Sequence, residues 1–340
     1  MFQNLKDRIR VNKEFDNVIK LMEKVEPYLD EIELIKPHKH FIVGEIEQEI
    51  LEKLENNPEL KTFQNKYLKN LGMFACERGF EDIAMLFLEN PETALQTDDE
   101  GNNIGMYAAK NGMEKLVLKA LDNYDLSVQR NYDFENLGMI AAYNKMENAT
   151  IKALDNDIAS TQQNPHGFNI GMFAAVHRLK DATMKSIQNE KSSNQQNYQD
   201  ENIAVIAMKN SMEDCVVEYI DLYGIGNDKR RAFCESKILG GCINKGLEKA
   251  SLKILEDIQN DDGTGHKDVI RRSIALNSAI LINNCGNYRI TDEIKKITDR
   301  YINEEMEEFD DVFENNDIKN SNSSQDYSEN SSQTEEEAIL

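Results

Sequence analysis

The most regular feature of the chain is a pattern of apolar and polar positions that returns every 33 residues. Each copy opens on asparagine, continues with an aliphatic residue, a very small residue and a methionine or valine, and has an alanine two positions later. The openings are Asn70, Asn103, Asn136, Asn169 and Asn202. Asparagine is a strong N-cap, because its side chain accepts a hydrogen bond from an unpaired backbone N–H at a helix start. The pattern predicts that a helix begins after each of these residues.

The small position of each copy indicates close packing. It is occupied by Gly72, Gly105, Gly138, Gly171 and Ala204. Glycine in a helix costs stability, so its recurrence predicts that a neighbouring element approaches the backbone there. Together with the alanine position, it favours thin helices that pack tightly between copies of themselves.

A second apolar stripe follows in each copy and predicts a second helix, buried on one side. We expect it to end in the left-handed region at an asparagine: Asn90, Asn123, Asn156 and Asn189. A polar loop of about 10 residues with a turn-forming Asp or Asn follows. Each copy therefore predicts helix, tight turn, helix and loop, and the whole chain an all-α fold, an α-solenoid of stacked helix-turn-helix repeats with a 33-residue period.

The copy GNNIGMYAAKNGMEKLVLKAL, residues 101–121, resembles the ankyrin repeat. The matching positions are Gly101, Ala108, Ala109, Gly112, Leu116, Val117 and Leu121. The segment Asn-Ile-Gly-Met stands where that family has Thr-Pro-Leu-His. Asparagine can replace threonine as the cap, but the proline and the histidine hydrogen bonds are missing. The resemblance implies partner binding through the loop tips and the exposed side of the first helix of each repeat.

The segments before and after the regular copies do not follow the same pattern. We predict a helical cap at 1–36, an ankyrin-like solenoid over 37–310 and a disordered acidic tail at 311–340. Within the solenoid, the clear repeats start near 70, 103, 136, 169 and 202, and are followed by a divergent repeat at 235–266 and a C-terminal cap at 267–310. The tail is expected to be disordered because residues 303–340 hold 13 acidic residues and one lysine.

Charge and composition narrow the range of partners. The chain has 62 acidic and 39 basic residues, a net charge of −23, which argues against a nucleic-acid or anionic-membrane surface. No apolar run approaches the ~18 residues that span a bilayer. Five cysteines without a C-x-x-C pair favour reduced thiols in the cytoplasm over a disulfide framework or zinc site. We expect a monomer with no metal, no cofactor and no catalytic residues.

The candidate binding residues are aromatic, histidine and acidic side chains at positions that vary between otherwise constant copies. Varying positions are expected to be free of packing roles, and exposed rings on a rigid scaffold can anchor a partner. One varying position holds Asn102, Glu135, Phe168 and Glu201, and another holds Lys110, Tyr143, Val176 and Lys209. The predicted partner-binding residues are Tyr132, Glu135, Tyr143, His166, Phe168, His177 and Tyr198.

The sequence thus predicts a non-enzymatic protein–protein interaction module that binds a partner protein of unknown identity on the concave face and loop tips of the solenoid. Two alternatives stay open. One is an enzymatic activity in the terminal helical segments, which show no catalytic constellation. The other is a secreted effector delivered into a host cell, because the end Ser331–Leu340 resembles the glutamate-rich C-terminal signals of bacterial type IV-secreted effectors, many of which carry ankyrin repeats.

Overall fold

The computed structural model describes residues 2–24, 36–224 and 238–259, together with residues 274, 277–278, 280–300 and 302–303. The described residues form helices joined by turns, and their only β-type pairings are the isolated bridges Thr97–Asn103 and Arg130–Asn136. The predicted all-α class is therefore confirmed over this part of the chain. The tail predicted at 311–340 lies outside the described residues, as do parts of the regions predicted at 235–266 and 267–310.

The chain divides into two compact units, Met1–Leu222 and Tyr223–Leu340. In the first unit, helices that we call the leading helices begin directly after the five cap asparagines: α4 (Leu71–Arg78), α7 (Ile104–Lys110), α10 (Leu137–Tyr143), α13 (Ile170–Val176) and α16 (Ile203–Lys209). A tight turn joins each of them to a following helix: α5 (Glu81–Glu89), α8 (Glu114–Ala120), α11 (Glu147–Ala153), α14 (Lys180–Ile187) and α17 (Glu213–Tyr223).

The predicted caps are confirmed at all five leading helices. Each asparagine side-chain oxygen accepts the backbone N–H three residues ahead, as Asn136 does from Met139 at 3.0 Å. In α4, α7, α10 and α13 the side-chain amide also donates to a glutamine 26 residues on, at 2.7–2.8 Å. Three of these glutamines donate in turn to a backbone carbonyl 34 residues before them. In α4, α10 and α13 the cap therefore ties the leading helix to the loops on both sides of it.

The prediction for the second asparagines is wrong. They do not end a helix in the left-handed region; each has extended backbone and caps a short third helix, as when Asn123 (φ −91°) accepts the backbone N–H of Asp125 at 3.0 Å. The third helices replace part of the expected loop: α6 (Pro91–Ala94), α9 (Tyr124–Val128), α12 (Asp157–Thr161) and α15 (Glu190–Ser193). Asparagine suits either end of a helix, and here its side chain serves the start of the next one.

The glycine position lies where the backbone of each leading helix meets the following helix. A Cβ atom on Gly171 would lie 1.8 Å from the Ser186 hydroxyl oxygen, and one on Gly138 would lie 2.7 Å from the Ala153 Cβ and 2.5 Å from the Ile170 Cδ1. Real Cβ atoms do not approach other atoms so closely. The predicted close approach is therefore confirmed, and it involves both the helix of the same pair and the aliphatic residue that opens the next leading helix.

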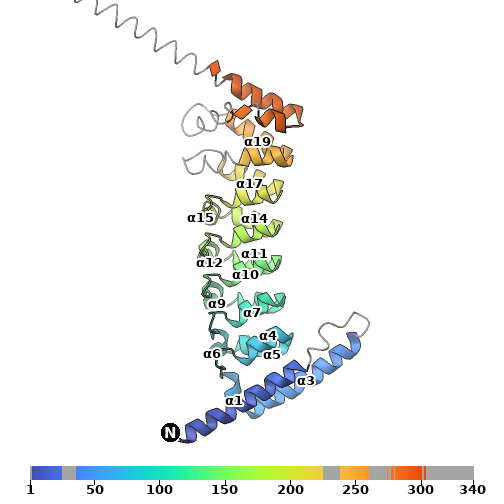
Figure 1. The fold of residues 1–340 in the computed structure, drawn as a ribbon, viewed down its shortest axis with the longest axis vertical. Helices are drawn as coiled ribbons and strands as arrows, with labels where there is room; N and C mark the ends of the chain where they lie inside the picture. The colour runs from blue at the N-terminus through green and yellow to red at the C-terminus, as the bar shows by residue number, and fades with distance from the viewer. Residues whose placement is uncertain are drawn as a thin grey trace, which may run out of the picture. The chain divides into compact units, whose positions relative to one another are not determined.

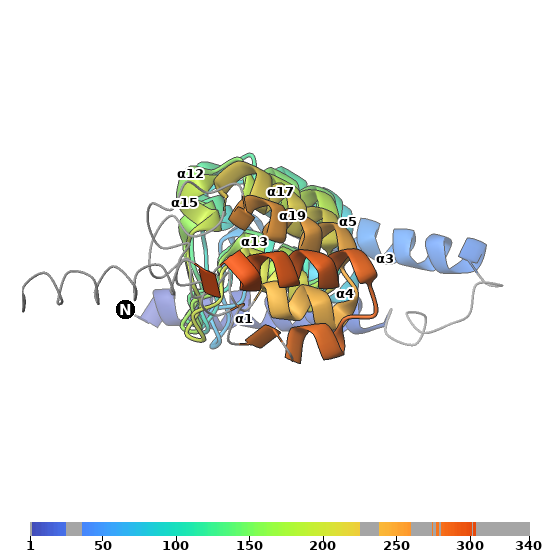
Figure 2. The same cartoon turned by 90° about the horizontal axis from the view of Figure 1, so that it is seen from above.

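Consecutive helix pairs pack against one another in chain order. Leading helix α4 contacts α7, α7 contacts α10, α10 contacts α13 and α13 contacts α16. Figure 1 labels the first three of them, α4, α7 and α10, in this order. The following helices also contact one another in order, from α5 to α14. Seen from above, the leading helices lie on one side of this unit and the following helices on the other (Figure 2).

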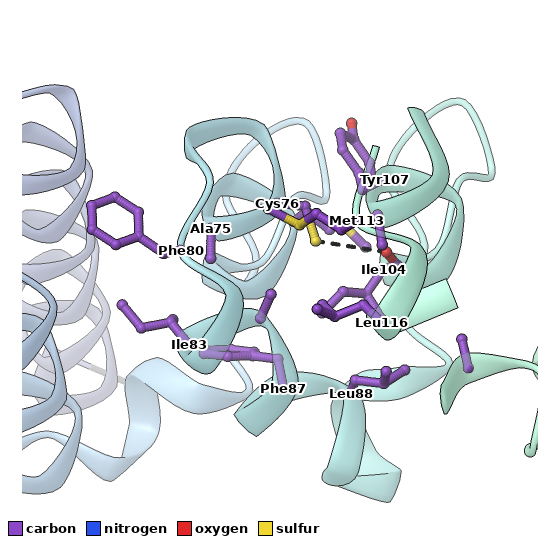
Figure 3. Packing of buried hydrophobic residues seen from close by; sticks show 14 of the residues in the cluster. Ala75, Cys76, Phe80, Ile83, Phe87, Leu88, Ile104, Tyr107, Met113 and Leu116 are labelled. Carbon is purple, nitrogen blue, oxygen red and sulfur yellow. Dashed lines mark hydrogen bonds between the residues drawn. The ribbon is translucent and has the colours of Figure 1, made fainter. Parts of the chain in front are cut away.

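The core between helix pairs is built from small and medium apolar side chains. Figure 3 shows Ile83 and Phe87 of α5 on the α4 side of this core and Ile104 and Leu116 on the α7–α8 side. All four side chains are buried. The Cys76 thiol lies between α4 and α7, 3.8 Å from the Ile104 carbonyl oxygen. Each pair thus buries apolar side chains both between its own two helices and against the neighbouring pairs.

The N-terminal helices cover the first pair. Helix α1 (Phe2–Glu23) packs against α3 (Lys36–Asn56), η2 (Pro58–Lys61) and α4. Phe15 of α1 is buried, with its ring centroid 5.1 Å from that of Phe63 and 5.9 Å from that of Phe74 in α4. The apolar face of α1 therefore packs on α4 at Phe74 and covers the start of the series of helix pairs.

The second compact unit contains α19 (Glu248–Gln259), preceded by helical residues 238–245. Gly246 between them has φ +68°, and the Leu247 N–H donates to the Cys242 carbonyl at 2.9 Å. Ala250, Ile254 and Ile258 of α19 are buried. Residues 288–300 form a further helix in this unit.

Candidate partner-binding surface

The loops that enter the leading helices share one backbone conformation. An Asn or Asp side chain at the base of each loop accepts the backbone N–H four residues ahead, at 2.7–3.0 Å: Asn65, Asp98, Asn131, Asn164 and Asn197. Three residues after it, the chain takes a positive φ at Leu68, Gly101, Phe134, Gly167 and Asp200. The local sequence therefore holds each loop tip rigidly and directs the residues between these two points outward.

Neighbouring loop tips are joined through the backbone. The Asp99 N–H donates to the Tyr67 carbonyl at 3.1 Å, Tyr132 to Glu100 at 2.9 Å and Tyr198 to His166 at 3.2 Å. The fourth equivalent position is Pro165, which has no N–H to donate. The loop of α10 and the loop of α13 consequently lack the bond that joins the others.

Three of the predicted residues are exposed at the loop tips, and we call Tyr132, His166 and Tyr198 the loop-tip residues. Tyr132 is 71% exposed and Tyr198 79% exposed, and His166 is also exposed. The Tyr132 ring lies over Gly101, where a Cβ atom would come within 2.9 Å of it. Tyr198 and His166 share the backbone hydrogen bond described above. The two tyrosines thus present rings from loops whose backbones are fixed.

A second group lies at the C-terminal ends of α10 and α13. Tyr143 is 62% exposed, and its ring meets that of His177 edge to face, with centroids 5.1 Å apart. Val176, beside His177, is 38% exposed. Burial lowers the pKa of His177, and the charge of Lys145 lowers it further, so the imidazole is neutral near pH 7. Among the described residues, no ring contact links this group to the loop-tip residues.

Some varying positions are not free of packing roles, contrary to our expectation. Phe168 is half-buried, with its ring centroid 5.5 Å from that of Phe173 in α13. Asn102 and Glu201, which occupy the same position, are buried. The Asn102 side chain accepts from Lys110 at 2.8 Å, and Glu201 pairs with Lys209. Glu135 is half-buried, and its N–H donates to Asn131 at 2.9 Å. This position directly precedes the cap asparagine of a leading helix, and its side chains are buried or half-buried whatever their type.

The sequence reasoning missed exposed residues at the left-handed positions. Phe134 is 50% exposed at φ +60°, with the Arg130 guanidinium 5.1 Å from its ring centroid. Lys145 and Arg178 are exposed at φ +61° in the turns after α10 and α13. The available signal was the alignment of these residues with glycines in other copies, such as Gly101 and Gly112.

A hollow of about 420 Å³ opens between the turn after α13 and the turn after α16. Its lining includes Arg178, Lys180, Ser211, Met212, Asp214 and Cys215. Lys180 and Asp214 form an ion pair at 2.5 Å across it. Cys215 is buried, and burial raises the pKa of its thiol to about 11. The hollow therefore holds a protonated thiol rather than an activated nucleophile.

The Asp98 carboxylate belongs to a polar network inside the first unit. Burial acts to raise the pKa of Asp98, but hydrogen bonds from the Tyr107 hydroxyl and from Asn102 outweigh it and hold this pKa below its usual value. The Tyr107 hydroxyl donates to Asp98 at 2.7 Å and the Asn102 N–H at 2.7 Å. This carboxylate fixes a loop. Within the described residues, no group of three or more His, Cys, Asp or Glu side chains is arranged to hold a metal ion.

No protein-family model matches this chain, and no curated protein sequence is significantly similar to it. In the part of the chain that the structure describes, no helix combines the length and the apolar character needed to cross a bilayer.

Proposed function

We propose that this chain is an ankyrin-like repeat protein whose repeats stack into an α-solenoid, and that it is a non-enzymatic module that binds a partner protein. The proposed repeats are supported by hydrogen bonds that recur at a 33-residue spacing. The backbone N–H that precedes each following helix donates to the carbonyl of the alanine five residues earlier, at 2.9–3.0 Å in all five pairs. The Leu247–Cys242 bond reproduces this geometry, which supports a divergent repeat in the second unit.

The observation that carries the binding proposal is the contrast between equivalent positions. The buried cap, aliphatic and alanine positions of the leading helices hold nearly the same residue in every copy, whereas exposed positions at the loop tips hold Asp99, Tyr132, Pro165 and Tyr198. Because both rings are largely exposed, a partner that covers them would remove apolar surface from water. Held on rigid loops, they lose little conformational entropy when a partner covers them.

The experiment compares partner capture by three forms of the full chain. The first is the parent chain, the second carries Tyr132→Ala and Tyr198→Ala, and the third carries Tyr124→Ala. Tyr124 is the matched control, because it is 57% exposed but lies on α9, away from the loop tips. Proteins retained on each immobilised form are quantified by mass spectrometry.

We expect a protein enriched by the parent chain to fall by 10-fold or more with the loop-tip variant and to be unchanged with the control, since a buried aromatic anchor contributes ~2 kcal/mol. Equal capture by all three forms would contradict the proposal, as would a loss shared by the control.

A further inference from the structure

Two adjacent turns carry cations in a backbone conformation that favours glycine. The turns that join leading to following helices all contain one residue at positive φ: Gly79, Gly112, Lys145, Arg178 and Ser211. Glycine adopts this conformation freely, whereas a longer side chain there is strained. Lys145 and Arg178 therefore occupy positions where glycine would fit the backbone better, and their side chains need another reason to be there.

Neither cation is neutralised within the described part of the molecule, where no ion pair includes Lys145 or Arg178. In the helix pairs on either side, the lysine that ends the leading helix has a side-chain partner, which is a carboxylate in α16 and a neutral amide in α7. Lys209 of α16 pairs with Glu201, and Lys110 of α7 donates to Asn102 at 2.8 Å. In α10 and α13 the positions of those lysines are taken by Tyr143 and Val176. The positive charge appears two residues later, in the turn, at Lys145 and Arg178.

Apolar surface lies directly beside these charges. Tyr143 and His177 pack edge to face between α10 and α13, and Val176 is partly exposed next to them. Lys145 is close enough to His177 for its charge to act on the imidazole. Arg178 borders the hollow of about 420 Å³. An exposed apolar patch is thus bordered by two unneutralised cations, on a chain whose net charge is −23.

We propose that Tyr143, Lys145, Val176, His177 and Arg178 form a docking surface, the helix-end surface, for an acidic segment of a partner protein that carries an aromatic or large aliphatic side chain between its carboxylates. The ring or aliphatic group covers Tyr143 and Val176, and carboxylates on either side of it meet Lys145 and Arg178. The rest of this acidic chain repels such a segment, so binding is confined to this surface. The inference rests on the proposed function and adds the chemistry of the partner.

The probe is a displayed library of random dodecapeptides, selected on the immobilised full chain. We expect the enriched peptides to have a net negative charge and an aromatic or large aliphatic residue among their acidic residues. Enrichment of neutral or basic peptides would overturn the proposal, and so would the absence of any enrichment.

The most enriched peptide is then measured by fluorescence anisotropy against variants of the full chain. We expect Lys145→Gly with Arg178→Gly to weaken binding by 10-fold or more without lowering the melting midpoint, because Gly79 and Gly112 already occupy the equivalent turns. Tyr143→Ala should weaken it to a similar extent. Higher salt should weaken binding to the parent chain, since exposed charges are screened.

The matched control removes two charges elsewhere. Lys115→Gln with Lys191→Gln changes exposed lysines on α8 and α15. This control should bind the peptide within about 2-fold of the parent chain. An equal loss in both double variants would mean that net charge alone governs binding, and the helix-end surface would be rejected.

The two proposals fail in different ways. Capture of a folded partner could depend on Tyr132 and Tyr198 while replacement of Lys145 and Arg178 leaves peptide binding unchanged. In that case the proposed function stands and the acidic segment is rejected. If the variant at Tyr132 and Tyr198 captures the partner as well as the parent chain does, while the peptide binds as expected, the loop tips are rejected as a binding element.

Discussion

The two ends of the leading helices are built in opposite ways. At the N-terminal ends, the asparagine cap recurs in all five helices, and its bond to a glutamine recurs in four. At the C-terminal ends, the last helical residues are Arg78, Lys110, Tyr143, Val176 and Lys209. The constant end is buried and ties successive loops together, whereas the varied end is exposed in four copies and half-buried at Arg78. We infer that the capped N-terminal ends hold the helix pairs in place, which leaves the C-terminal ends, like the loop tips, free to carry a binding surface.

The largest stability effect is expected where the leading helix has no room for a side chain. Gly171→Ala would place a methyl group 2.4 Å from the Ser186 Cβ, an atom that cannot move without its backbone. Overpacking costs about 3 kcal/mol, and the better helix propensity of alanine returns about 1. We expect a net loss of about 2 kcal/mol in urea denaturation followed by circular dichroism.

Gly44→Ala is the control for this prediction, because no atom lies within 4 Å of a Cβ built at Gly44 in α3. That variant should be as stable as the parent or more stable by up to about 1 kcal/mol. If Gly171→Ala behaves like Gly44→Ala, the close approach at the constant end is not present in solution.

A smaller loss is expected from the cap itself. Asn136→Ala removes the bond from the Met139 N–H at 3.0 Å and the bond to Gln162 at 2.8 Å. Loss of an N-cap costs about 1 kcal/mol. A double-mutant cycle with Gln162→Ala, measured by urea denaturation, isolates the bond between the two side chains, and we expect a coupling of about 0.5–1 kcal/mol. Purely additive losses would show that the cap does not tie the helix to the loop.

The constant end could be predicted from the sequence, because single residue types decide it. Asparagine before an apolar run is a cap, and a recurring glycine indicates contact. The third helices were missed because an asparagine can either end one helix or start another, and spacing alone does not distinguish the two. At the varied end, the exposure of Tyr143 was predicted but the half-burial of Phe168 was not, since its contact with Phe173 depends on where the loop places both rings.

The roles of Lys145 and Phe134 as exposed left-handed residues were also missed. Neither is a residue type that prefers a positive φ, so local propensity indicates nothing unusual. Only the comparison with Gly112 and Gly101 at the equivalent positions reveals the conformation. Packing that is repeated can be predicted from the sequence, whereas features found in one copy require the structure.

The most direct test of the division between the two ends gives the α10 pair the varied residues of the α7 pair. The variant carries Tyr143→Lys and Lys145→Gly, which are the residue types of Lys110 and Gly112. Urea denaturation and partner capture are measured on the same preparation. We predict a free energy of unfolding within about 0.5 kcal/mol of the parent chain and a loss of capture of 10-fold or more. Unchanged capture, or a fall of several kcal/mol in stability, would contradict the separation of a constant end that holds the fold from a varied end that binds.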